Sequence, residues 1–296
     1  MRVTQNMIIN NMLRNLNDGL RRMERYNDQL SSGKRLRVPS DHPGDVTRAM
    51  YFRSQLAEVT QYTANGKEAL SWLEATDSAL DNAGSVLARA RELAVYGATG
   101  SLSPSDRAAI AEEVATLIDH LAQVANSALG GRYLFGGHKT DTPPYVVSPT
   151  DPPHWEYVGD RGIIEMEIAP EVKLPVNVVG KDVFDEMFQV LQDLHQALLD
   201  NDGEKVGGEI LGELDVQIDR LLRVRAEVGA RSHRVEAGLE RLADLEINVT
   251  RMLSEKEDVD VARAIMELKM EENVYRLALA STARIIQPTL LDFLRP

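Results

Sequence analysis

A hydrophobic side chain returns at every seventh residue along a stretch in the second half of the chain. The positions are Leu214, Leu221, Val228, Val235, Leu242 and Val249, with companions at Val224, Leu245 and Met252. This spacing is typical of the seam along which one α-helix packs against another in a coiled coil. The pattern predicts long helices that lie side by side.

A second seam begins close to residue 1 and runs through Ile9, Leu16, Met23 and Leu30. Chain termini usually fray unless something holds them, so an apolar stripe here predicts a partner. A last helix, expected from Val259 to Ile286, carries a matching stripe, and an apolar cluster follows it. The resulting candidate assembly surface comprises Ile9, Met12, Leu16, Met23, Leu30, Ile265, Leu268, Tyr275, Leu279, Ile286, Leu290 and Phe293.

The patterns before this last helix predict five more helices. The first is expected from Thr4 to Ser32 and the second from Gly44 to Tyr96. The second carries two apolar rows, Trp72–Ala79–Val86–Leu93 and Leu73–Leu80–Leu87–Ala94. A third helix begins at Pro104 and ends at Gly130–Gly131, another begins at Lys181, and the seamed helix spans Glu204 to Ser254. We expect the internal rows to form intramolecular core and the two terminal stripes to need other partners.

Helical periodicity disappears between Tyr133 and Val179, where prolines are frequent. Alternation at Trp155–Val158, Ile164–Ile168 and Val172–Val176 predicts short strands joined by turns. The expected fold is therefore mainly α, a long antiparallel helical rod with coiled-coil seams and a small inserted β domain. The expected parts are an N-terminal assembly arm (1–43), a helical rod domain (44–132 and 180–256), a β domain (133–179) and a C-terminal assembly arm (257–296).

Charge and composition exclude several classes of function. The net charge is −13, which argues against nucleic acid as a partner because such binding rests on neutralising phosphates. Residues 1–37 hold eight Lys/Arg and three Asp/Glu, a net of +5, and the remainder carries −18. We expect this basic arm to complement acidic protein surface. The absence of cysteine excludes disulfides and thiolate chemistry. With no signal peptide and no apolar run long enough to span a bilayer, we expect no membrane insertion.

No catalytic, cofactor or metal site is predicted. His138, Asp141, Asp151 and His154 flank the β domain and could hold a metal, but solvated loop residues are the favoured interpretation. Gly136 and Gly137 with Lys139 superficially suggest a phosphate loop, although the required lysine does not follow Gly136 directly. An enzyme with a site in the β domain stays open as a competing hypothesis.

Three motifs together resemble the flagellin superfamily, and within it the branch that joins the flagellar hook to the filament. They are Leu30-Ser-Ser-Gly-Lys-Arg-Leu-Arg-Val-Pro-Ser-Asp41, Arg132-Tyr-Leu-Phe-Gly-Gly137 and Gly180-Lys-Asp-Val-Phe-Asp185, and the segment from Val261 to Leu294 is similar to the flagellin-type tail. His42 departs from the family, which usually has a second Asp there. Flagellins lack the second motif, which favours the junction branch over a short flagellin-type filament subunit, the alternative.

The resemblance implies a structural adaptor, not an enzyme, that is exported unfolded through the flagellar type III apparatus without a cleaved signal and works outside the cell. Its implied partners are another hook-associated protein, flagellin, other copies of itself in a ring, and a cytoplasmic export chaperone. The resemblance also implies that the terminal helices are disordered in the free monomer. An amphipathic segment without a partner cannot offset its conformational entropy, so folding would be coupled to binding.

Overall fold

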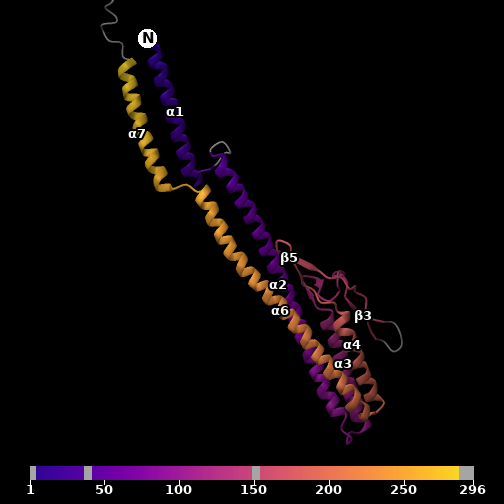
Figure 1. Cartoon of the computed structure of the whole chain (residues 1–296). Helices are drawn as coiled ribbons and strands as arrows, with labels where there is room; N and C mark the ends of the chain where they lie inside the picture. The colour runs from indigo at the N-terminus through magenta and orange to yellow at the C-terminus, as the bar shows by residue number, and fades with distance from the viewer. Residues whose placement is uncertain (1–4, 37–41, 149–153, 287–296) are drawn as a thin grey trace, which may run out of the picture. The chain divides into compact units, whose positions relative to one another are not determined.

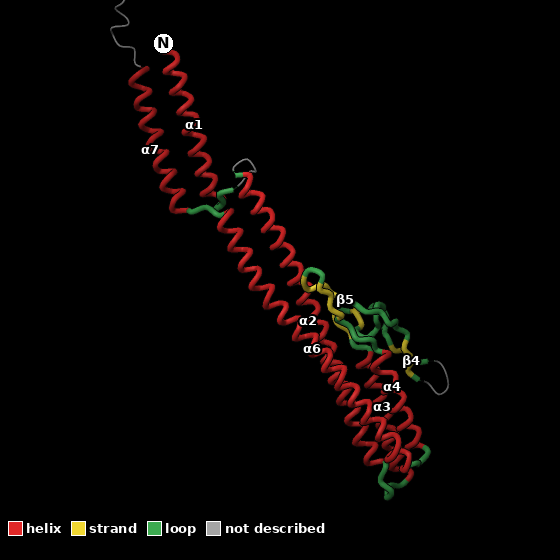
Figure 2. Tube along the Cα trace, viewed as in Figure 1, coloured by secondary structure: helices red, strands yellow, loops and turns green. Residues whose placement is uncertain are grey.

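The computed structural model describes residues 5–36, 42–148 and 154–286, and these residues form two compact units. The arm unit comprises residues 1–58 and 246–296, and the core unit comprises residues 59–245. Two long helices, α2 (Pro43–Gly97) and α6 (Leu211–Glu257), contribute to both units. The arm unit also holds α1 (Gln5–Ser32) and α7 (Val261–Ile286), which lie side by side in Figures 1 and 2.

In the core unit, α2 and α6 run antiparallel in a fixed register. Arg225 Nε lies 3.1 Å from Asp77 Oδ1, and Arg91 Nε lies 2.6 Å from Asp215 Oδ1. A Cβ placed on Gly66 would lie 2.7 Å from Leu239 Cδ2, so the helices approach closely where the glycine stands. Both α2 rows are buried, as are the five seam positions from Leu214 to Leu242; the sixth, Val249, is buried in the arm unit. The predicted intramolecular seam is confirmed within this unit.

The companion positions of the seam behave differently. Val224 is half-buried and Leu245 is 44% exposed, so the second row of the predicted seam is wrong at Leu245. The α3 (Pro104–Ala125) and α4 (Lys181–Leu199) helices pack against each other and lie beside only part of α2 and α6 (Figure 2). A single neighbouring helix covers one row of a helix, so a second row is buried only where more helices surround it.

Helix α3 ends four residues earlier than its apolar pattern predicts. It begins with a capping box in which the Ser103 and Asp106 side chains each bond the other's backbone N–H. After Ala125 the chain forms a hairpin of β1 (Ala128–Leu129) and β2 (Arg132–Tyr133). Gly130 and Gly131 have φ values of 58° and 83° and make its turn. Two adjacent glycines with positive φ favour a tight hairpin, so they turn the chain within a sheet instead of stopping a helix.

The remaining strands form two more antiparallel pairs. Strand β3 (Tyr145–Val147) pairs with β4 (Trp155–Tyr157), and β5 (Glu165–Ala169) pairs with β6 (Val172–Pro175). The alternating segments had predicted β4, β5 and β6. Strand β3 was not predicted, because it is three residues long and follows two prolines.

The chain between α4 and α6 contains a feature that the periodicity did not predict. After the turn at Asn201, α5 (Gly203–Lys205) leads into one turn of π-helix, η1 (Val206–Ile210), before α6 begins. The buried Arg107 guanidinium closes this end of the unit and donates to the carbonyls of Gly97 and Thr99, each at 2.9 Å. These carbonyls lie at and just beyond the C-terminal end of α2, where the helix dipole favours a cation.

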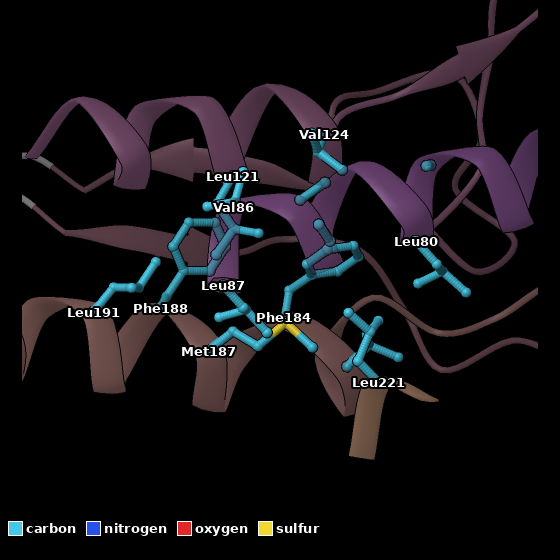
Figure 3. Close-up of a cluster of buried hydrophobic side chains, with 14 of the residues drawn as sticks. Leu80, Val86, Leu87, Leu121, Val124, Phe184, Met187, Phe188, Leu191 and Leu221 are labelled. Carbon is cyan, nitrogen blue, oxygen red and sulfur yellow. The ribbon is translucent and has the colours of Figure 1, made fainter. Parts of the chain in front are cut away.

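The second and third motifs of the resemblance meet where the β module joins the helices. Phe135 and Phe184 pack edge to face with ring centroids 4.9 Å apart, and the Gly180 N–H donates to the Phe135 carbonyl at 3.0 Å. Tyr145 O–H donates to Asp185 at 2.7 Å. Figure 3 shows Phe184 among the side chains that α2, α3, α4 and α6 bury together. The resemblance therefore rests partly on residues that fix the β module to the helical core.

Gly180→Ala is expected to destabilise the core unit by about 1–2 kcal/mol, because an added methyl overpacks a filled joint. The new Cβ would lie 2.9 Å from the Phe135 carbonyl oxygen and 3.0 Å from its Cβ, and neither can move without shifting backbone. Urea unfolding measures the change. Gly100→Ala, in a loop where nothing lies within 4 Å, is the control, and equal stability of the two variants would contradict this reading.

Candidate assembly surface

In the arm unit, α1 and α7 pack as an antiparallel pair. Arg22 makes a two-pronged contact with Glu271, at 2.7 and 3.1 Å, and Tyr26 O–H donates to Glu267 at 2.8 Å. Gly19 lies against the Tyr275 ring. Within the chain, the partner of the N-terminal stripe is therefore α7, a helix more than 200 residues away in sequence.

This pairing leaves most of its apolar surface uncovered. Among the described side chains of α1 and α7, Ala264 is the one buried hydrophobic residue. Six predicted assembly residues are half-buried, namely Met12, Leu16, Met23, Leu30, Leu268 and Tyr275. Ile265 and Leu279 are exposed, at 46% and 44%. The side chains of Ile9 and Ile286 and both Leu290 and Phe293 lie outside the described residues. The predicted set is thus divided between the α1–α7 contact and solvent.

Sequence reasoning missed a second apolar stripe on α7. Met266, Met270, Val274 and Leu277 follow one another at helical spacing, and they are 67%, 58%, 49% and 70% exposed. On α1, Leu13 and Leu20 are likewise exposed, at 48% and 43%. We call the four α7 residues the outer stripe. The seven-residue rule directed attention to the row containing Ile265, whereas steps of three and four residues from Met266 would have found the outer stripe.

The arms are tied at the point where both change direction. Gly33, with φ at +70°, ends α1, and its carbonyl accepts from Val259 N–H at 3.0 Å. Arg35 N–H donates to the Glu257 carbonyl at 2.6 Å, and Arg35 Nη2 also reaches Asp45 Oδ2 at 3.0 Å. These contacts bring together the ends of α1 and α6 and the starts of α2 and α7. Gly33, Lys34 and Arg35, which belong to the first motif of the resemblance, supply one side of this tie.

A buried carboxylate lies at the centre of the tie. Glu257 is 2% exposed and forms ion pairs with Lys34 and with Arg53, whose Nη2 lies 2.6 Å from Glu257 Oε1. The Arg53 hydrogen bond, helped by Lys34, holds the pKa of Glu257 below its ordinary value although burial opposes this. Glu257 therefore stays ionised at neutral pH and links α6 to the segments before and within α2.

The basic N-terminal arm meets acidic side chains of the same chain, as its charge predicts. Arg22 pairs with Glu271, Lys34 with Glu257 and Arg35 with Asp45. The Arg22 hydrogen bond lowers the pKa of Glu271. Arg22 and Glu271 are partly exposed, so their pair contributes little stability and mainly sets the register of α1 on α7.

In the described part of the β module, the glycine loop is filled by the module's own side chain. Asp160 accepts backbone N–H groups from His138 at 2.7 Å and from Gly162 at 2.8 Å, so the module's own carboxylate occupies the glycine loop. These bonds lower the pKa of Asp160. Within the described ranges, no group of three or more His, Asp or Glu side chains could hold a metal, and no helix is long and apolar enough to cross a bilayer. Asp151 lies outside those ranges.

Comparison with known proteins identifies two matching family profiles. The bacterial flagellin N-terminal helical region matches residues 3–140, and the bacterial flagellin C-terminal helical region matches residues 211–294. Together they cover about three quarters of the chain. They include α1, α7 and every residue of the tie.

Similar whole proteins extend this match. The flagellar hook-associated protein 3 of Escherichia coli K12 is 26% identical over 92% of this chain and 93% of its own length. The flagellar filament 33 kDa core protein of Treponema phagedenis is 25% identical over 90% and 91%. Among solved structures, the flagellar junction protein of Legionella pneumophila has a TM-score of 0.61 at 15% identity, covering 71% of this chain and 99% of its own. A hook-associated protein from Vibrio parahaemolyticus has a TM-score of 0.61 at 20% identity, covering 74% and 100%.

Proposed function

The chain belongs to the flagellin superfamily, and we propose that it is the structural subunit that joins the flagellar hook to the filament. The observation that carries the proposal is the match to a hook-associated protein 3 over more than nine tenths of both chains. The Arg132–Gly137 motif, which is buried in part at the β-module joint, favours the junction branch over a filament subunit.

The mechanism we propose is folding of α1 and α7 coupled to subunit assembly. In support, the α1–α7 pair buries no large hydrophobic side chain among those described, whereas the core unit buries dozens. Two amphipathic helices with so little burial cannot offset the entropy of ordering their residues. Neighbouring subunits that cover the outer stripe and the exposed α1 leucines would supply the missing burial. The chain could then travel extended and become ordered at its destination.

The proposed surroundings follow from that role. The subunit lies outside the cell in a ring of copies, with another hook-associated protein on one side and flagellin on the other. Before export, a cytoplasmic chaperone holds the C-terminal arm. The role is structural and involves no catalysis, no cofactor, no nucleic acid and no membrane insertion.

The test is complementation in bacteria that lack the gene for this chain. Cells without it should bear hooks but no filaments, and the wild-type gene should restore filaments. Normal filaments without the gene would contradict the proposal. Purified chain added to filament seeds tests the alternative, because a short flagellin extends them, whereas a junction subunit does not grow long filaments alone.

Leu277→Asp combined with Met270→Asp is expected to abolish filaments while changing the stability of the free chain by less than about 0.5 kcal/mol. Both side chains are more than half exposed, so neither contributes to folding of the single chain, but a buried carboxylate would block an interface. Electron microscopy of complemented cells gives the first result and urea unfolding the second. Asn273→Asp, an exposed polar neighbour on the same helix, is the control. Normal filaments in the double variant would remove the outer stripe from the interface.

A further inference from the structure

Two glycines in a helical stretch of the core unit have no packing role in the described chain. Gly208 lies in η1 and Gly212 in the first turn of α6, and a Cβ placed on either would meet nothing within 4 Å. The neighbouring Gly207 is different, because its Cβ would lie 2.9 Å from Ala98. Glycine destabilises a helix relative to alanine. These two glycines therefore leave a bare helix surface that only an external group could use.

Of the two glycines, Gly212 lines a groove between α4 and the η1–α6 segment. The groove has a volume of about 470 Å³, and Val216, 57% exposed, lies on its wall one turn beyond Gly212. Four carboxylates line it and no Lys or Arg does, namely Glu186, Asp193, Glu209 and Glu213. Glu186 pairs with Arg220 outside the groove, but the ion pairs of the described residues include none of the other three.

A buried amide in the groove wall lacks a donor. Gln217 is 5% exposed, and its Nε2 donates to Glu186 Oε2 at 3.1 Å. Its Oε1 has no hydrogen-bond partner within the described part of the chain. An unsatisfied buried acceptor beside unneutralised carboxylates suits a ligand that brings both positive charge and N–H donors, which is what a guanidinium provides.

In a second groove along α6, the acidic side chains are neutralised by an arginine of the same chain. Gly229 is also uncontacted, and its groove is lined by Asp77 and Asp81. Arg225 lines this groove too and pairs with both carboxylates, with Nη1 2.6 Å from Asp81 Oδ1. In the groove at Gly212 only Glu186 has a cation, Arg220, so among the described residues the charges of Asp193, Glu209 and Glu213 are available to a partner.

The chain itself carries a complementary helix face. Arg14 and Arg21 are exposed on α1, seven residues apart, on the side opposite the Gly19 contact with α7. Neither forms an ion pair among the described residues, whereas Arg22, on the side that meets α7, pairs with Glu271. The same seven-residue spacing separates Glu186 from Asp193 on α4, so one arginine can reach the unpaired Asp193 while the other joins Arg220 at Glu186.

We propose that the Arg14–Arg21 face of α1 in one copy docks into the acidic groove of a second copy. Gly212 allows the helix to approach, the carboxylates of Asp193, Glu209 and Glu213 pair with the arginines, and the Gln217 side chain rotates so that its buried Oε1 receives a guanidinium N–H. One surface meets a different surface of an identical chain, so the contact is head-to-tail and can close a ring. The inference rests on the proposed ring of subunits and names one of its contacts.

The natural chain lacks cysteine, so single cysteines can map the contact in the full-length protein. An Arg21→Cys copy and a size-tagged Asp193→Cys copy are mixed and treated with a short bis-maleimide. We expect the mixed dimer to exceed either same-variant dimer several-fold, and to decline at high salt because the contact is ionic. Arg21→Cys mixed with Glu227→Cys, an exposed acid on α6 outside the groove, is the control. Equal yields in the two mixtures would overturn the proposal.

A chain that carries both Arg21→Cys and Asp193→Cys provides a further check. If this chain forms only the crosslink within itself and none to a second copy, the proposal is also overturned. Gly212→Leu provides an independent test, because it fills open space and replaces a helix-destabilising glycine, so it should not lower the melting temperature while it removes the mixed dimer. Gly229→Leu, in the groove that Arg225 neutralises, should leave the yield of the mixed dimer unchanged.

Charge reversal tests the contact in cells. Cells that carry Arg14→Glu with Arg21→Glu should lose filaments, and adding Asp193→Arg with Glu213→Arg should restore them. If all groove variants form normal filaments, the groove contact is wrong. The proposed function is contradicted by a different result, namely normal filaments on cells that lack the gene.

Discussion

Deletion of residues 261–296 is expected to abolish filaments completely and to leave the core unit intact. The deletion removes α7 and the outer stripe, so α1 loses its partner and neighbouring subunits lose the apolar surface they would cover. The core cluster lies between Ala69 and Val235, so none of its buried side chains is touched. Urea unfolding should give the midpoint of the full-length chain, and electron microscopy should show hooks without filaments.

A matched variant separates loss of the arm from loss of any C-terminal segment. Replacing residues 261–286 by an equally long flexible polar linker keeps the chain length and the final ten residues, and it should fail in the same way. Filaments on cells that carry either variant would show that α7 is dispensable and would contradict the structural role of the arms.

Glu257→Gln is expected to weaken the tie between the arms and the long helices by about 1–2 kcal/mol per subunit. This is less than for a fully buried charge pair, because the Lys34 and Arg53 side chains are 50% and 52% exposed and solvent screens them. The substitution leaves Lys34 and Arg53 facing a neutral amide in a site where the carboxylate is 2% exposed. Filaments on complemented cells should detach from hooks at a lower temperature than in wild type. Glu255→Gln, an exposed acid two residues earlier, should not change detachment.

The pH dependence of attachment follows from the lowered pKa of Glu257. A carboxyl whose pKa is lower in the folded state contributes its stability above the ordinary value of 4.5 and loses it as pH falls through the folded pKa. Wild-type filaments should therefore loosen progressively below about pH 4.5, while this contribution is absent at every pH in Glu257→Gln. Identical acid profiles for the two proteins would show that this carboxylate does not hold the tie.

The sequence predicted the long helices and their internal seam because the buried face of a helix appears in the sequence as apolar residues at regular spacing. Leu214, Leu221 and Val228 recur at the spacing that an antiparallel partner covers, and each is buried. Resemblance identified the motifs at Gly33, Phe135 and Gly180, but not that the last two contact each other. Such contacts depend on how distant segments fold back, which no local pattern records.

The errors have equally physical causes. In the sequence, the Gly130–Gly131 pair predicts the end of a helix. The structure shows that both residues have positive φ values and form the turn of a hairpin. The π-helical turn at Val206–Ile210 has no periodic signature in the sequence. The α1–α7 contact joins residues such as Arg22 and Glu271, whose complementary charges are visible in the sequence only after the pairing is known.

Amide hydrogen exchange of the free full-length chain tests coupled folding of the arms most directly. The account predicts strong protection from about residue 45 to residue 255 and nearly unprotected exchange in α1 and α7, because an uncovered two-helix pair opens constantly. In assembled flagella the same arm amides should become protected. If α1 and α7 of the isolated monomer exchange as slowly as α3, the arms are already folded before assembly and the account is contradicted.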